Sequence, residues 1–169
     1  VVEGLETPGS VEAALILGAD LGQGYILARP MPGAALVPWL AGFRARWDAR
    51  HPATAAGALA AALVWEEQFL ALPPGLRAWQ AHAAAGDAVG GYLGAQTLPA
   101  LRDSQAAMLA AAIGGPADPD YRRARDAFLA QLIERARIEE RHIGTDVACM
   151  EDVGEQSMAA ATPYVDDQW

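Results

Sequence analysis

A carboxylate follows the first strand-forming residues of the chain. Val1 and Val2 are β-branched, they lead directly into Glu3, and Gly4 comes next. A strand that delivers a carboxylate to its own C-terminal end is typical of an active site, because catalytic groups are concentrated where such elements pass into loops. Glu3 is therefore the first candidate catalytic residue. The strand expected at Val1 and Val2 raises a question, because no earlier strand precedes it with which it could pair.

Two further groups of residues could carry chemistry in the second half of the chain. Glu139 and His142 are an acid and a histidine three positions apart on an expected helix, a spacing found in metal sites of helical bundles. Such sites need matching ligands from other helices and the chain has only 3 histidines, so we expect a surface pair. Cys149 has no basic neighbour in sequence to lower its pKa, which gives no support for a reactive thiol.

Composition excludes several classes of function. The net charge of −9 argues against a nucleic-acid polymer as partner. One cysteine excludes an internal disulfide and favours a reducing, cytoplasmic location. No apolar run is long enough to cross a bilayer, so no membrane contact is expected in this segment. All 12 basic residues are arginines, which we attribute to biased base composition. Acidic residues dominate from Glu139 onward, which predicts an acidic, flexible tail over residues 143–169.

The first 43 residues alternate as β/α units do. Thr7 or Ser10 can cap a helix over residues 11–17, and Gly18 stands where a glycine ends a helix. Residues 23–28 are predicted to form a short buried strand, which the prolines at 30 and 32 stop. Residues 34–43 return to helical spacing.

The remainder of the chain predicts helices only. Residues 44–51 form a polar linker, and residues 52–142 a helical bundle, which makes the fold class mainly α. We expect one helix over residues 53–72, with Leu59, Leu63, Phe69 and Leu70 as its apolar positions. A second helical stretch, at 75–95, is interrupted by glycines. A third, at 97–113, is capped by Thr97. The last starts at Asp118-Pro119-Asp120. Trp65 and Trp79 are expected in the core or in a seam between helices.

Four groups of residues in the first 43 positions carry a resemblance: Glu3-Gly4-Leu5-Glu6-Thr7, Gly18-Ala19-Asp20, Gln23-Gly24-Tyr25 and Ala28-Arg29-Pro30-Met31-Pro32. In this order and spacing they resemble the C-terminal end of an EAL domain, the bacterial cyclic-di-GMP phosphodiesterase domain. That domain is a TIM-type barrel, and barrels of this kind run to about 250 residues. The resemblance implies that residues 1–43 are the last two β/α units of such a barrel, which explains the unpartnered first strand.

The resemblance also implies roles for three residues. Glu3 would belong to the carboxylate network around the metals and the attacking water, and Gln23 would line the same site. Glu6 would have a supporting, helix-capping role. The family's other ligands and its catalytic lysine are expected upstream of this chain, which contains no lysine. The intact domain is expected to use Mg²⁺ or Mn²⁺ to activate water, whereas this segment alone is expected to be inactive and to hold no cofactor.

The helical part is faintly similar to the chemoreceptor zinc-binding type of four-helix domain. The similarity rests on Trp65, on the run Val89-Gly90-Gly91-Tyr92-Leu93 and on the helix that follows it. When the chain is aligned with the family on these residues, the family's zinc ligands correspond to Ala62, Asp87, Ser104 and Met108. Only Asp87 among them could bind zinc, and a single carboxylate is a poor anchor for a tetrahedral nitrogen and sulfur site. We therefore predict no metal here.

These observations lead to a hypothesis with two alternatives. The chain is expected to be the C-terminal regulatory or sensory portion of a signalling phosphodiesterase that converts cyclic-di-GMP to linear pGpG, and to form a homodimer through its bundle. In the first alternative the barrel is degenerate and the protein is a receptor or scaffold. In the second the chain is the helical domain with a leftover flank, and residues 1–43 lack a barrel-like arrangement because one or two strands leave exposed edges.

Overall fold

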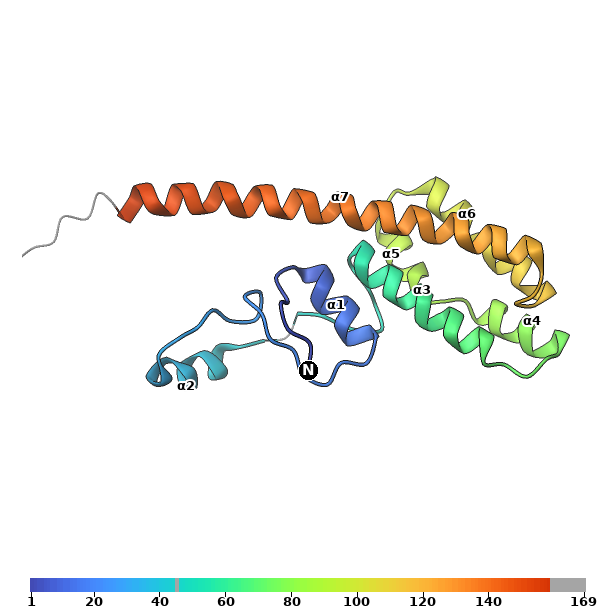
Figure 1. The fold of residues 1–169 in the computed structure, drawn as a ribbon, viewed down its shortest axis with the longest axis horizontal. Helices are drawn as coiled ribbons and strands as arrows, with labels where there is room; N and C mark the ends of the chain where they lie inside the picture. The colour runs from blue at the N-terminus through green and yellow to red at the C-terminus, as the bar shows by residue number, and fades with distance from the viewer. Residues whose placement is uncertain (45, 159–169) are drawn as a thin grey trace, which may run out of the picture.

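The protein is mainly α-helical (Figure 1). The computed structural model describes residues 1–44 and 46–158, and of residues 143–158 it describes the backbone only. Its helices follow in the order α1 (Pro8–Ile16), α2 (Gly33–Gly42), α3 (Ala55–Leu70), α4 (Leu76–Ala85), α5 (Val89–Ala95), α6 (Pro99–Ala111), a single 3₁₀ turn η1 (Ala112–Gly114) and α7 (Pro119–Met158). Helix α7 packs against α3 and α6, and α1 packs against α3. The first 43 residues are thus attached to the bundle through α1.

Helix α1 begins where the sequence predicts a cap. Thr7 is its N-cap, and the Ser10 amide donates to Thr7 Oγ1 at 3.1 Å while the Thr7 amide donates to Ser10 Oγ at 3.2 Å. This reciprocal pair satisfies two amides that the first turn leaves without partners. The helix ends at Leu17, and Gly18 follows with φ of 84°, as predicted.

The strand predicted at residues 23–28 is wrong in its extent. Among the described residues β pairing is limited to an isolated parallel bridge between Val2 and Gly22. Residues 25–27 form a turn, closed by hydrogen bonds from the Leu27 and Ala28 amides to the Gly24 carbonyl, both 3.1 Å. The Tyr25 side chain is 62% exposed. With pairing on one edge only, the chain satisfies its amides locally instead of extending a strand.

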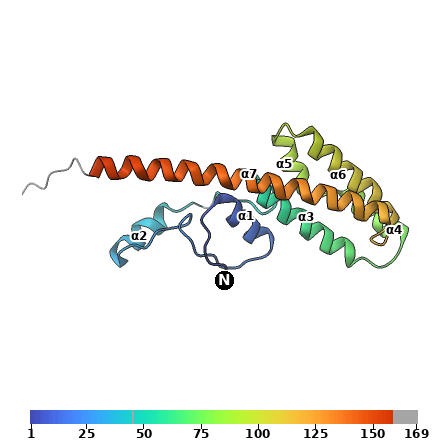
Figure 2. The same cartoon turned by 45° about the horizontal axis from the view of Figure 1, so that its top comes forward.

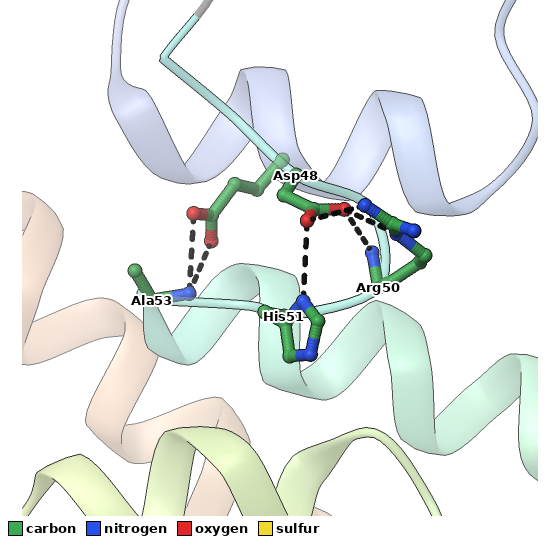
Figure 3. A network of polar contacts seen from close by, with 5 residues as sticks. Asp48, Arg50, His51 and Ala53 are labelled. Atoms are coloured by element: carbon green, nitrogen blue, oxygen red, sulfur yellow. Dashed lines mark hydrogen bonds and ion pairs between the residues drawn. The ribbon is translucent and has the colours of Figure 1, made fainter.

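Helix α2 forms where helical spacing predicts one, but no residue of it is buried. The rings of Trp39 and Phe43 contact each other in a tilted arrangement with centroids 4.9 Å apart, while Val37 is 73% exposed. Residues 48–51 then form a compact turn around Asp48 (Figure 3). The Asp48 carboxylate accepts from the Arg50 amide at 2.9 Å and contacts the His51 ring at 3.1 Å. The hydrogen bond from the Arg50 guanidinium holds the Asp48 pKa well below its ordinary value.

The core of the bundle lies along an alanine-rich face of α3. Ala58, Ala62, Trp65 and Phe69 are buried at spacings of three and four, so one stripe of α3 faces its neighbours. The predicted apolar positions Leu63 and Leu70 are instead exposed, by 42% and 57%. Small alanines allow the neighbouring helices to approach this stripe closely, and the bulky leucines project away from it. Phe69, Tyr92, Tyr121, Phe128 and Leu132 complete the core, and complete burial of each large apolar side chain contributes about 1.5–3 kcal/mol.

Helices α4 and α5 are separated at Gly86, which has φ of 69° and interrupts the helical stretch as the sequence predicts. The interruptions expected at Gly90, Gly91 and Gly94 are wrong, because all three lie within α5. Helix α6 begins later than expected. Its N-cap is Leu98, and Thr97 makes no cap, because Pro99 takes the first helical position and shifts the start by one residue. Trp65 is buried and Trp79 packs against the core cluster, as expected.

Helix α7 starts as predicted, with the Asp120 amide donating to Asp118 Oδ1 at 2.8 Å. It does not end near residue 142: its backbone is helical to Met158, through most of the segment expected to be a flexible tail. Residues 159–169, including Trp169, lie outside the described residues. Both views show α7 extending beyond the region that α3 and α6 cover (Figure 1, Figure 2). No helix in the described part of the chain is long and apolar enough to span a membrane.

Candidate functional site

The backbone brings Glu3 and Gln23 side by side. The Val2 amide donates to the Leu21 carbonyl at 2.9 Å, and the Gln23 amide donates to the Val2 carbonyl at 2.8 Å. The Leu5 amide then donates to the Gln23 carbonyl at 3.1 Å. Since Val2 pairs with Gly22 in parallel, Glu3 and Gln23 occupy adjacent positions of the two segments. Both side chains are exposed.

Two glycines of the N-terminal motifs have clear structural reasons. Gly4 has φ of 72°, a left-handed conformation that a residue with a Cβ rarely adopts. A Cβ at Gly24 would collide with the backbone of Leu5. Both glycines therefore act on the pairing of the two segments, Gly4 by turning the chain after Glu3 and Gly24 by allowing close backbone approach.

The structure places Glu6 at an exposed position just before the first helix. The cap of α1 is made by Thr7 and Ser10, and Glu6 precedes it. The described residues contain no group of three or more histidine, cysteine, aspartate or glutamate side chains arranged to hold a metal ion. Glu3 and Gln23 offer one carboxylate and one amide, which are too few to hold the two metal ions of such a site by themselves.

A second polar cluster, unanticipated from the sequence, surrounds the N-terminus of α3. Glu12 of α1 is only 3% exposed, and its carboxylate accepts from the Ala53 amide at 3.1 Å and the Thr54 amide at 2.9 Å. It also accepts from Thr54 Oγ1 at 2.7 Å. A negative charge on unpaired amides at a helix N-terminus is favourable. The periodicity of α1 carries no signal for this role, because the two partners lie 41 and 42 positions away in sequence.

Glu139 of α7 reaches the same helix end. Its Oε2 accepts from the Ala55 amide at 2.7 Å, and its Oε1 accepts from the Tyr92 hydroxyl at 2.8 Å. Arg135 donates to the same oxygen at 3.2 Å. The expected surface pair of Glu139 and His142 is therefore wrong: Glu139 is half-buried against α3, while His142 Nδ1 contacts the Ile138 carbonyl at 2.7 Å. Tertiary hydrogen bonds to α3 outweigh a local contact along α7.

Burial changes the acid–base properties of this cluster. It raises the pKa of Tyr92 to about 12; the hydrogen bond with Arg135 acts in the opposite direction and the carboxylate of Glu139 in the same one. Tyr121, buried against Phe69 with ring centroids 5.0 Å apart, also has its pKa raised to about 12 by burial. Both phenols are thus stabilised in their neutral form, which makes them structural groups at neutral pH.

The four positions that correspond to zinc ligands lie on α3, on α6 and in the turn before α5, with Ser104 half-buried on α6. Ala62 and Met108 are buried in the core, each 2% exposed. Asp87 lies in the turn before α5, and its Oδ1 accepts a short hydrogen bond from Gln105 Nε2. Burial raises the Asp87 pKa, although the hydrogen bond from Gln105 partly offsets the effect.

Comparison of the chain with protein-family models, with curated proteins and with solved structures gives no match. The resemblances to the EAL domain and to the zinc-binding bundle therefore stay predictions that rest on the residues quoted for them.

Proposed function

We propose that this chain is the C-terminal portion of an EAL-type phosphodiesterase, followed by a helical domain that regulates it. The intact enzyme would add water across a phosphodiester bond of cyclic-di-GMP and release linear pGpG. Mg²⁺ or Mn²⁺ bound to the intact barrel would supply activated water. Glu3 would contribute a carboxylate at the mouth of the barrel, and Gln23 would line the same pocket.

The observation that carries this proposal is the parallel bridge between Val2 and Gly22, because it puts Glu3 and Gln23 in adjacent positions of the two segments. The two residues come from motifs twenty positions apart, with α1 between them, and hydrogen bonds of 2.8–3.1 Å align their segments in parallel. A strand, a helix and a parallel return are the repeating unit of a β/α barrel. Exposed apolar side chains on α1 and α2, including Leu15 and Leu40, fit a segment whose other barrel neighbours lie outside this chain.

The regulatory half of the proposal rests on the junction between α1 and the bundle. Glu12 follows Glu3 by nine residues and holds the N-terminus of α3 through buried hydrogen bonds. A change in the position of α3 would therefore act on the helix that directly follows the Glu3 motif. We propose that the bundle pairs with a second copy or binds a small ligand, and that either event acts on the barrel through this contact.

The test is hydrolysis of cyclic-di-GMP by the full-length protein, followed by chromatography of pGpG in the presence of Mn²⁺. Substituting Glu3→Gln should lower the rate by about a hundredfold or more, because a carboxylate in the catalytic network is lost. The matched control Glu6→Gln removes an exposed carboxylate three residues away and should retain most activity. The 169-residue chain alone should release no pGpG.

The alternative of a degenerate receptor predicts a different outcome. If the full-length protein binds cyclic-di-GMP in equilibrium dialysis but produces no pGpG, the protein is a receptor and not an enzyme. A full-length protein that neither binds nor hydrolyses the dinucleotide would overturn the proposal.

A further inference from the structure

A cleft of about 550 Å³ lies where α2, the turn at residues 25–27 and the residues after α2 meet. Its main lining residues come from these three segments: Leu27 from the turn, Trp39 from α2, and Phe43, Arg44, Arg46 and Trp47 from the residues that follow α2. The volume falls in the range of small-molecule sites. Glu3 and Gln23 do not line the cleft, so it is separate from the pocket proposed for hydrolysis.

Three aromatic side chains of the cleft recur at intervals of four residues. Trp39, Phe43 and Trp47 are all half-buried, and the rings of Trp39 and Phe43 contact each other with centroids 4.9 Å apart. Phe43 and Trp47 also line a smaller cavity of about 160 Å³ beside α1, so both contribute to the packing of the N-terminal part. Trp39 does not line that cavity, and it belongs to a helix without buried residues. The Trp39 indole therefore offers a flat surface on which a planar ring can stack.

Two arginines of the cleft can donate to a ligand. Arg44 donates from Nη1 to the carbonyls of Ala41 at 3.1 Å and Phe43 at 2.8 Å, which fixes its guanidinium at the end of α2. Both bonds use Nη1, so the Nε–H and Nη2–H groups of Arg44 can serve other acceptors. Within the described part of the chain neither Arg44 nor Arg46 forms an ion pair. Because a guanidinium can bind two phosphate oxygens with parallel N–H groups, these side chains favour a phosphate.

The charge around the cleft differs from the charge of the whole chain. Residues 29–50 contain four arginines and a single acidic residue, Asp48, whereas the whole chain has a net charge of −9. Asp48 binds the Arg50 guanidinium through two hydrogen bonds of 3.1 Å, so its negative charge is compensated locally. The charges of Arg44 and Arg46 then dominate the cleft, which attracts an anion and repels a cation.

We propose that this cleft binds a nucleoside monophosphate. The base would stack on the Trp39 indole, and the phosphate would accept hydrogen bonds from Arg46 and from the Nε–H and Nη2–H groups of Arg44. The other lining side chains are apolar or carry only an indole N–H, so they do not distinguish one base from another. This proposal goes beyond hydrolysis of cyclic-di-GMP. Binding is measured on this chain without that dinucleotide, so failure of either proposal is seen independently of the other.

Titration of the ¹⁵N-labelled chain with AMP at neutral pH and constant ionic strength tests the proposal. The Trp39 indole N–H resonance, assigned from the Trp39→Phe variant, should shift and saturate with a Kd of about 1 mM. Adenosine, which lacks the phosphate, and ribose 5-phosphate, which lacks the base, should each bind about fivefold more weakly than AMP. Arg46→Gln should weaken AMP binding by about fivefold and leave adenosine binding unchanged, because only a contact with the phosphate is lost. Arg77→Gln, which removes an exposed arginine on α4, is the matched control and should bind AMP as the unmodified chain does.

Any of four results would overturn the proposal: no saturating shift of the Trp39 indole at about 10 mM AMP, equal binding of adenosine, equal binding of ribose 5-phosphate, or unchanged AMP affinity in Arg46→Gln. Equal binding of adenosine would indicate an apolar surface only, and equal binding of ribose 5-phosphate would indicate that exposed arginines attract any anion.

A second variant keeps the test decisive if Arg46→Gln does not fold by circular dichroism. Trp39→Leu changes a residue on a helix without buried residues, so the fold should persist. It should weaken binding of AMP and of adenosine by about fivefold and leave binding of ribose 5-phosphate unchanged, because only the stacking surface is lost. These titrations are followed through the backbone amides of residues 39–43. An AMP affinity that stays the same in Trp39→Leu would also overturn the proposal.

Discussion

Glu12 of α1 and Glu139 of α7 bind consecutive backbone amides at the N-terminus of α3. Glu12 takes the amides of Ala53 and Thr54, and Glu139 takes that of Ala55. Two elements that are far apart in sequence, α1 and α7, are therefore fixed to one end of α3, where amides lack partners within the helix. This point joins the segment that carries Glu3 to the helical bundle, so its strength decides whether the two parts move together.

Loss of the Glu12 carboxylate should destabilise the whole chain. We expect Glu12→Ala to lower the free energy of unfolding by about 2–3 kcal/mol, since two amides and the Thr54 hydroxyl lose their acceptor in a buried position. Glu12→Gln retains one acceptor oxygen and should cost about 1–2 kcal/mol. Urea unfolding followed by circular dichroism measures both. Glu67→Gln, at an exposed position on α3, should have a negligible effect.

Alkaline pH should weaken the bundle through its buried phenols. Tyr92 has a native-state pKa of about 12 against an ordinary value of 10.0, so the unfolded chain ionises first as the pH rises. Stability is therefore complete below pH 10 and falls between pH 10 and 12. Urea midpoints across this range should decline, and Tyr92→Phe should show a shallower decline. A midpoint independent of pH up to 12 would contradict the burial of the phenol.

The sequence predicted most elements of this fold but not the contacts between them. The caps at Thr7 and Asp118 and the ends at Gly18 and Gly86 depend on neighbouring residues, so local chemistry reveals them. The buried stripe of α3 was predicted in part: Trp65 and Phe69 lie in it as expected, whereas Leu63 and Leu70 are exposed and small alanines fill the remaining positions. The role of Glu12 was not predicted, because its hydrogen-bond partners lie at the end of a helix that is distant in sequence and produce no periodic pattern in α1.

The candidate sites also divide into residues that sequence motifs reveal and residues that only packing brings together. Glu3 and Gln23 could be named from linked motifs, and backbone pairing then aligned them. The cluster of Glu12 and Glu139 could not be named, since its members come from α1 and α7 and meet only at the N-terminus of α3. The resemblance singled out Asp87 only as the aligned position that could bind zinc, whereas its hydrogen bond with Gln105 of α6 depends on packing.

Gly24→Ala should separate the two N-terminal segments. The added methyl group collides with the Leu5 backbone, so the hydrogen bonds from Leu5 to Gln23 and from Ile26 to Leu5 cannot both persist. We expect faster hydrogen exchange at these amides and unchanged exchange in α3 and α7. Gly33→Ala is the matched control, because a Cβ there meets nothing within 4 Å. Equal protection in both variants would show that the pairing does not depend on close backbone approach.

We expect the chain to form a homodimer in solution. Light scattering is expected to give a mass near twice 17.7 kDa, because α7 extends beyond the helices that cover it and keeps apolar surface such as Ile133, 37% exposed. Ile133→Arg should shift the population toward monomer. The same change at Leu76 on α4, 56% exposed, should leave the dimer intact. A monomeric unmodified chain would remove pairing as the route of regulation and leave ligand binding.

Asp87 should lower the stability of the chain at neutral pH. Burial raises its pKa, so the native state holds the proton more tightly than the unfolded chain does. The stabilising effect of that proton is present at low pH and is lost as the pH rises through the native pKa. Asp87→Asn should therefore raise the melting temperature at pH 7 and lose this advantage in acid, below the ordinary value of 3.8. A melting temperature that falls at neutral pH would mean that the carboxylate is needed for folding. A rise would show that the buried carboxylate costs stability at neutral pH.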